Sequence, residues 1–190
     1  VGQNSLDLQN VSREIEEVGS TSNWVLADLS STRGVLQVLD ECNSPDVLVA
    51  NAGITMAGRA GTASWKVLEK MSFLLGTGVA QLIEGVVPSM VRKGEGTIIV
   101  VSSIASLIDM PNSAVYAASK SFATRYASSL AREVGPAGVK VTAVCPGYVH
   151  TNLHRRAGLD HLEKRVPRWL WIDASTVVRA AVAGAQKGKS

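Results

Sequence analysis

The stretch TIIVVSS, residues 97–103, decides the fold class, because five consecutive β-branched residues end abruptly in two serines. β-Branched side chains favour strands, and a strand without polar alternation is buried on both faces. DVLVANAG (46–53) and GVKVTAVCPG (138–147) repeat the pattern: an apolar run followed by small, polar or glycine-containing residues. Strands of this kind form parallel sheets that helices cover on both faces.

Segments with helical spacing alternate with these strands. A short β-favouring run at residues 23–27 comes before the strand at 46–50. Apolar residues recur at intervals of three and four, or serine and threonine caps open a helix, in residues 5–18, 30–39, 64–91 and 113–134. The sequence therefore predicts one α/β domain over residues 1–190, doubly wound around a parallel sheet, with ligands beyond the carboxyl ends of its strands.

Composition and charge exclude several classes of function. The 190 residues carry 19 Lys and Arg against 16 Asp and Glu, and apolar residues make up 46% of the chain. This usage is typical of a globular domain, and scattered basic residues give no basis for nucleic-acid binding. Two cysteines without close spacing indicate neither a disulfide framework nor a zinc site, so we expect no metal and a cytoplasmic protein.

The most apolar window, residues 73–91, approaches the length of a membrane span. It contains Glu84 and Pro88, and its apolar residues fall at helical spacing. We therefore interpret it as a buried helix and expect no membrane span.

Tyr116 and Lys120 are four residues apart on the predicted helix at 113–134, which places phenol and ammonium on one face about one turn apart. A nearby ammonium lowers the pKa of a phenol, so we expect Tyr116 to exchange a proton near neutral pH. Ser103, at a strand end 13 residues before Tyr116, is placed to donate a hydrogen bond to a substrate carbonyl. Taken singly, the pair also fits a solvated helix surface, and Ser103 fits a turn cap.

Together these residues give a pattern that resembles the short-chain dehydrogenase/reductase family of YxxxK type, in particular its ketoacyl-reductase-like members. The family's marks are NAG after a strand, a serine followed by twelve residues and Tyr-x3-Lys, and PG-x3-T after a later strand. This chain carries them in order, as Asn51–Gly53, Ser103, Tyr116, Lys120 and Pro146–Thr151. The resemblance implies a Rossmann-like fold that interconverts a carbonyl and an alcohol by hydride transfer with NADP or NAD.

The resemblance also assigns roles. It implies that Tyr116 is the general acid or base, that Lys120 holds the nicotinamide ribose and tunes Tyr116, and that Ser103 polarises the carbonyl. Asp28 would contact the adenine, although a helix N-cap is an equal alternative for it. The implied cofactor-binding residues are Asp28, Leu29, Asn51, Ala52, Gly53, Tyr116, Lys120, Pro146, Gly147, Val149 and Thr151.

Two features depart from the family's pattern. The glycine-rich turn TGxxxGxG and two strands that the family places before position 1 are absent from the 190 residues. The family's strand order, 3-2-1-4-5-6-7, then leaves a gap between residues 23–27 and 46–50. We expect a domain incomplete at both ends, from a parent polypeptide of roughly 250 residues.

The family's helix asparagine is also missing. Residues 70–80 contain no asparagine, and Phe73 or Leu75 takes the likeliest place. A catalytically impaired protein that binds cofactor or serves as a scaffold therefore stays as the alternative function.

Cofactor, substrate and assembly follow from the same resemblance. Residues 2–4 contain no carboxylate to repel a 2′-phosphate, and Gln3 can donate to it, which favours NADP over NAD. Residues 150–172 would form the substrate wall, and their apolar members suggest a small apolar carbonyl or alcohol, although these aromatics also suit simple packing: Leu153, Leu159, Leu162, Trp169 and Trp171. We expect a homodimer or homotetramer that pairs through the helices at 64–91 and 113–134.

Overall fold

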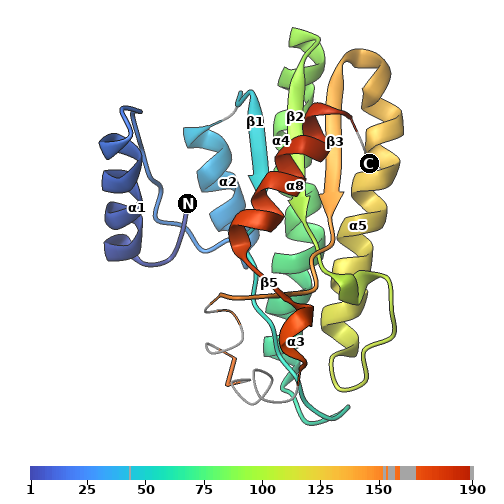
Figure 1. Cartoon of the computed structure of the whole chain (residues 1–190). Helices are drawn as coiled ribbons and strands as arrows, with labels where there is room; N and C mark the ends of the chain where they lie inside the picture. The colour runs from blue at the N-terminus through green and yellow to red at the C-terminus, as the bar shows by residue number, and fades with distance from the viewer. Residues whose placement is uncertain (43, 152, 154–156, 159–165, 189–190) are drawn as a thin grey trace.

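The computed structural model describes residues 1–42, 44–151, 153, 157–158 and 166–188. A parallel sheet in the order β1-β2-β3 lies at its centre (Figure 1). Its strands are β1 (Val47–Ala50), β2 (Gly96–Val101) and β3 (Val139–Val144). Val49 pairs with Ile99, and Ile99 pairs with Thr142. The predicted parallel sheet is thus confirmed.

Helices cover both faces of this sheet, as expected for a doubly wound fold (Figure 1). Ile98 and Val100 of β2 belong to one apolar cluster with Ile83 and Val86, whereas Ile99 packs with Ala181 on the other face. The helices are α1 (Ser5–Glu17), α2 (Thr32–Glu41), α3 (Trp65–Ser72), α4 (Gly78–Lys93), α5 (Ala114–Val134) and α8 (Ala174–Gln186). Alternate residues of one strand thus support opposite layers, which explains why β2 is apolar throughout.

Short elements complete the described fold. The turns of 3₁₀-helix are η2 (Ile104–Ser106), η3 (Gly135–Ala137) and η4 (Arg168–Leu170), and a π-helical turn, η1 (Phe73–Thr77), joins α3 to α4. A small parallel pair consists of β4 (Tyr148–Val149) and β5 (Trp171–Ile172).

The predicted helix at residues 64–91 is continuous from Trp65 to Lys93, but it is not a regular α-helix. The π-helical turn η1 interrupts it where Gly76 lies against Phe122 and the backbone of Ser119 on α5. By length and a mean hydropathy of 1.4 this helix is able to cross a membrane. Half of its most apolar window is buried inside the fold, as in the core helix of a globular domain.

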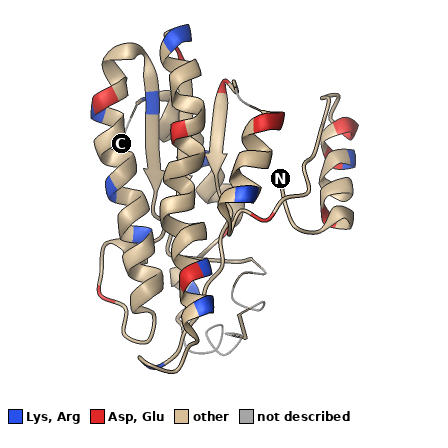
Figure 2. Ribbon diagram, turned by 180° about the vertical axis from the view of Figure 1, so that it is seen from behind, with Lys and Arg blue, Asp and Glu red and all other residues tan. Residues whose placement is uncertain are grey.

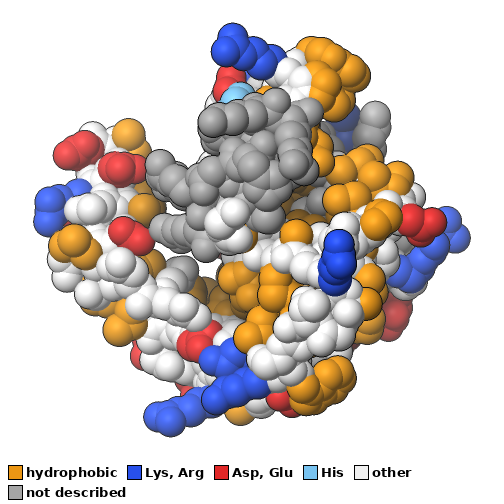
Figure 3. All heavy atoms as spheres, turned by 90° about the horizontal axis from the view of Figure 1, so that it is seen from below, with side chains coloured by type: hydrophobic (Ala, Val, Ile, Leu, Met, Phe, Trp, Pro, Cys, Tyr) orange, Lys and Arg blue, Asp and Glu red, His pale blue; other side chains and the backbone are white. Residues whose placement is uncertain are grey.

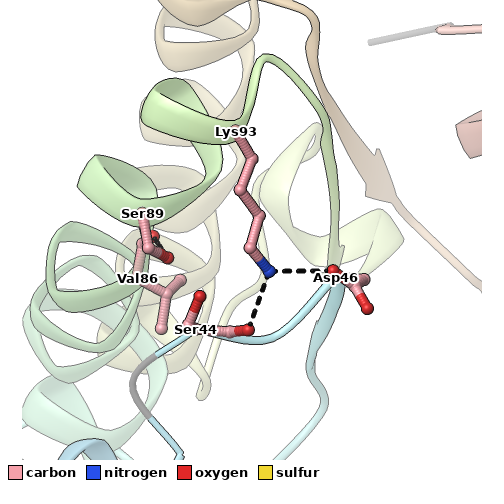
Figure 4. Close-up of polar contacts among 5 residues, drawn as sticks. All are labelled: Ser44, Asp46, Val86, Ser89 and Lys93. Atoms are coloured by element: carbon pink, nitrogen blue, oxygen red, sulfur yellow. Dashed lines mark hydrogen bonds and ion pairs between the residues drawn. The ribbon is translucent and has the colours of Figure 1, made fainter.

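A lysine on α4 anchors the start of β1. Lys93 Nζ lies 3.0 Å from a carboxylate oxygen of Asp46 and donates to the carbonyl of Ser44 at 3.2 Å (Figure 4). Lys93 also stands in the last turn of its helix, where a cation interacts favourably with the exposed carbonyls. These contacts join the end of α4 to the beginning of the strand beside it.

The expected strand at residues 23–27 is reduced to one parallel bridge between Gly2 and Leu26. Among the described residues, no strand pairs with the outer edge of β1, so the expected gap lies between Leu26 and β1. Val47 and Val49 are each more than half exposed along β1.

The turn before β3 gives a test of the backbone. Gly138 has a φ of +82°, and a Cβ there would overlap the carbonyl oxygen of Gly94. We expect Gly138→Ala to lower the free energy of unfolding by about 2 kcal/mol or more, through strain and this overlap. Gly135→Ala is the matched control, since a Cβ at Gly135 meets no atom within 4 Å. Urea denaturation of both variants measures the difference, and equal stabilities would contradict the prediction.

Candidate active site

The carboxyl ends of three parallel strands gather the predicted residues at one edge of the sheet. Asn51 follows β1, Ser103 follows β2 and Pro146 follows β3. The backbone N–H of Ile104 donates to the carbonyl of Pro146 at 2.8 Å, which joins two of these loops directly. Figure 3, a view from below, shows hydrophobic side chains gathered across this end of the molecule.

Ser103 and Tyr116 are brought together. Ser103 caps η2, where its Oγ accepts a hydrogen bond from the N–H of Ala105 at 3.2 Å. Its side chain also lies near Tyr116 on α5 and acts to lower the pKa of that phenol. The end of β2 and the first turn of α5 thereby bring two hydroxyl groups close together.

The pKa expected for Tyr116 is wrong in direction. Burial of the phenol raises the pKa of Tyr116 above its ordinary value, and the side chain of Ser103 opposes this only partly. The Nζ of Lys120 donates to the carbonyl of Val101 at 2.8 Å. Tyr116 is therefore a protonated phenol at neutral pH.

Lys120 is only 7% exposed, deep in the interface between α5 and β2. Burial lowers the pKa of Lys120 to about 8, while the neighbouring Cys145 acts in the opposite direction. An amine with such a pKa exchanges protons in a range that an ordinary lysine does not reach. Tyr116 and Lys120 do lie one turn apart on α5, as the spacing predicts.

Asp28 is held in place by its neighbours rather than by a helix. Its carboxylate accepts hydrogen bonds from the N–H of Ser30 at 2.9 Å and from the side-chain amide of Gln3. The hydrogen bonds from the side chain and backbone of Ser30 are the main reason that the pKa of Asp28 is lowered. The N-cap of α2 is Ser31, whose Oγ accepts from Gly34, so the capping alternative for Asp28 is wrong.

A hollow of about 250 Å³, open to solvent, lies between the Asp28 loop and β1. Leu29, Asn51 and Ala52 line it, together with apolar residues of α2 and α4. A Cβ at Gly53 would meet Leu75 only at ordinary contact distance, so the protein's own packing leaves space above this loop. The lining is mostly apolar, with Asn51 as its polar side chain, and the hollow lies in the gap beside the unpaired edge of β1.

The segment after β3 is arranged around stacked aromatic rings. Trp171 of β5 stacks on His150 with ring centroids 5.0 Å apart and lies 5.3 Å from Tyr148. Trp169 is 79% exposed. The packing alternative thus fits Trp171, whereas Trp169 is free to contact a substrate.

The remaining predicted residues of this segment lie near the same edge. Gly147 is exposed and Val149 is half-buried in β4, while Thr151 is exposed and its Oγ1 accepts from the N–H of Leu153 at 3.3 Å. Leu159 and Leu162 of the expected substrate wall lie outside the described residues.

Sequence reasoning missed three side chains beside Lys120. Ser102 Oγ lies 2.6 Å from Thr124 Oγ1, and Thr124 Oγ1 lies 3.9 Å from Cys145 Sγ. One signal was available for Thr124, because Tyr116, Lys120 and Thr124 recur every four residues along one stripe of α5. No local pattern connects Cys145 to them.

Comparison with known proteins matches this geometry. The family model described as short chain dehydrogenase matches residues 1–161. Dehydrogenase/reductase SDR family member 7B of Mus musculus is 32% identical over 160 residues, which cover 80% of this chain and 50% of that protein. The chain thus spans about half the length of the curated relatives that it matches first.

Solved structures support the fold. A short-chain dehydrogenase from Sphingobium yanoikuyae in complex with NADPH superposes with a TM-score of 0.90 at 24% identity, covering 98% of this chain and 73% of that one. An NAD⁺-bound xylitol dehydrogenase gives a TM-score of 0.79 at 20% identity, covering 96% and 79%. The Rossmann-like architecture is therefore shown, and the two neighbours carry different nicotinamide cofactors.

Proposed function

Because the chain belongs to the short-chain dehydrogenase family, we propose that it reduces a small apolar ketone or ketoacyl-type carbonyl to an alcohol, with NADPH as the cofactor. The observation that carries this proposal is that Ser103 lies beside the half-buried Tyr116, with Lys120 one turn further along α5. Carbonyl reduction requires two donors at the carbonyl oxygen, one that polarises it and one that protonates it.

The residues of this chain supply the proton and the polarisation. When bound, the nicotinamide supplies the hydride that the carbonyl carbon receives. Ser103 donates a hydrogen bond to the carbonyl oxygen and stabilises the negative charge that develops there. Tyr116 then transfers its phenolic proton to that oxygen, and its raised pKa does not prevent this, since an alkoxide is a far stronger base than a phenolate.

The cofactor would lie across the carboxyl ends of the strands. Asn51–Gly53 and Leu29 would hold its adenosine half, and Pro146–Val149 would hold the nicotinamide end, because these loops occupy the same edge of the sheet. Asp28 is oriented by Ser30 toward the same region. Lys120 would bind the adjoining ribose.

The preference for NADPH depends on the absence of a carboxylate in residues 2–4. We expect kcat/KM with NADPH to exceed that with NADH by about tenfold, and Gln3→Glu to remove this preference through charge repulsion with the 2′-phosphate. The assay follows NADPH and NADH oxidation with a panel of hydrophobic ketones.

Gln9→Glu on α1 introduces the same charge on an exposed side chain outside residues 2–4, so it should leave the cofactor ratio unchanged. Absence of oxidation of either cofactor with every ketone would contradict the proposed function. A ratio below one in the native chain would contradict only the cofactor preference.

One observation favours a second candidate, a cofactor-binding protein with little turnover. Residues 70–80 contain no asparagine, and the π-helical turn η1 presents Phe73 and Leu75 in that region. NADPH binding without ketone reduction, measured by quenching of the cofactor's fluorescence, would select this candidate.

We also propose that two copies pair through α4 and α5. Phe122 and Tyr126 stack along α5 with ring centroids 6.3 Å apart, and Phe122 is 45% exposed. Tyr126 donates to a carboxylate oxygen of Glu84 on α4 at 2.6 Å, which joins the two helices into one surface. The charged residues in Figure 2 are scattered in both signs, so an apolar surface on these helices is the better candidate for pairing.

A further inference from the structure

We propose that Thr124 and Cys145 are positioning residues for this site, because hydrogen bonds that start at Cys145 end on the backbone carbonyls of Lys120 and Ser103. The inference rests on the proposed function, since it concerns the geometry of the groups that perform the reduction. Neither residue touches the reacting atoms in the arrangement described above.

The first arm runs from β3 to α5. Cys145 Sγ lies 3.9 Å from Thr124 Oγ1, and Thr124 Oγ1 lies 2.6 Å from Ser102 Oγ. Ser102 Oγ in turn donates to the carbonyl of Lys120 at 3.1 Å. Ser102 is 4% exposed, so its bond to the carbonyl of Lys120 is shielded from water.

The second arm runs from β3 to the loop after β2. Cys145 Sγ lies 3.6 Å from Ser106 Oγ, and Ser106 Oγ donates to the carbonyl of Ser103 at 2.7 Å. Ser121 of α5 donates to the carbonyl of Ser106 at 2.9 Å and ties the helix to the same turn. Both series of hydrogen bonds therefore start at the thiol of Cys145. One ends on the backbone of Lys120 and the other on the backbone of Ser103, two residues of the proposed site.

The count of protons gives these bonds a direction. Ser102 uses its only hydroxyl proton on the carbonyl of Lys120, so Thr124 must donate to Ser102. Ser106 uses its proton on the carbonyl of Ser103. Cys145 then faces two oxygens that have no proton left for it, and it serves them as a thiol donor, one at a time.

These hydrogen bonds matter because the positions of Lys120 and Tyr116 depend on how α5 lies against β2. The ammonium of Lys120 reaches across to Val101 at 2.8 Å, and Tyr116 meets Ser103 from the same helix. A shift of α5 along β2 changes both contacts together. Misplacement by about 1 Å is enough to lower turnover substantially.

The decisive variant is Thr124→Val, which keeps the shape of the side chain and removes its hydroxyl. We expect kcat for ketone reduction to fall about tenfold, with KM for the ketone nearly unchanged, because the reacting groups rather than the substrate are displaced. Thr124→Ser retains the hydroxyl and should restore kcat to within about twofold. Cys145→Ala should act in the same direction as Thr124→Val, and Cys145→Ser should retain the donor.

Ser89→Ala is the matched control for the loss of a buried hydroxyl. Ser89 Oγ donates to the carbonyl of Val86 at 2.8 Å within α4, away from the strand ends (Figure 4). It should lower the melting temperature about as much as Thr124→Val does and leave kcat unchanged.

A second readout does not depend on turnover. Nuclear magnetic resonance of the labelled lysine side chains follows the titration of Lys120, whose signal is assigned by its loss in Lys120→Met. Among the described residues, Cys145 at the end of β3 is the titratable side chain that acts on Lys120 from another element. Loosening α5 admits water, so the titration midpoint should move upward in Thr124→Val and return in Thr124→Ser.

The outcomes separate the two proposals. Absence of turnover in the native chain contradicts the proposed function, and the Lys120 titration then decides the inference by itself. Unchanged kcat and an unchanged Lys120 midpoint in Thr124→Val, or losses that Thr124→Ser does not rescue, would overturn the positioning role.

Discussion

Tyr116→Phe is expected to lower kcat for ketone reduction by about 10²–10⁴-fold, because it removes the group that protonates the product oxygen and changes little else. The ring is largely buried, and its removed hydroxyl meets Ser103. Ser103 keeps its role in the turn, where it caps η2, so the fold should persist. Cofactor binding should change by less than about threefold, since a phenyl ring fills the same volume.

The control for this prediction is Tyr126→Phe on the same helix. Tyr126 donates to Glu84 at 2.6 Å and lies ten residues from Tyr116, away from the strand ends. It should keep kcat within about twofold of the native value. Stopped-flow measurement of NADPH oxidation compares the variants, and equal rates for Tyr116→Phe and the native chain would exclude the chemistry proposed for this site.

Lys120→Met is expected to separate turnover from stability. Turnover should fall about 100-fold, because the ribose contact and the amine beside Tyr116 are lost. The free energy of unfolding should nevertheless rise by roughly 1–3 kcal/mol at pH 7, because a buried amine is replaced by an apolar side chain of similar length. The lost hydrogen bond to Val101 reduces this gain.

The effect of Lys120 on the free energy of unfolding depends on pH. In the folded protein the pKa of Lys120 is about 8, below the ordinary value of 10.5. Between these values the unfolded chain binds more protons at this position than the folded chain does, so this group makes the native protein more stable as pH rises from 8 to 10.5. The advantage of Lys120→Met should therefore be largest below pH 8 and fade toward pH 10.5.

Lys140→Met is the matched control, since Lys140 is exposed and donates to the carbonyl of Gln186 at 2.9 Å. Its effect on stability should be small. Urea denaturation at pH 7 and pH 10 measures all three proteins. A loss of stability in Lys120→Met at pH 7 would contradict the argument that its burial is costly.

Most elements of the fold were predictable because they depend on neighbours in the chain. The apolar runs at residues 46–50 and 97–101 became β1 and β2, and Asn4 caps α1 as its side chain suggests. The π-helical turn η1 could not be predicted, since it arises where Gly76 meets Phe122 of a helix more than forty residues later. The same holds for the run at residues 23–27, which forms only one bridge.

The candidate site also has features that the sequence predicted and features that only the structure revealed. Spacing along one helix was enough to place Tyr116 and Lys120 on one face, and Ser103 at a strand end beside them, because helix and strand geometry are local. The direction of the Tyr116 pKa, the bond of Lys120 to Val101 and the link from Cys145 through Thr124 came only from the tertiary structure. Burial and long-range contacts depend on which elements pack together, and no local pattern of residues contains that information.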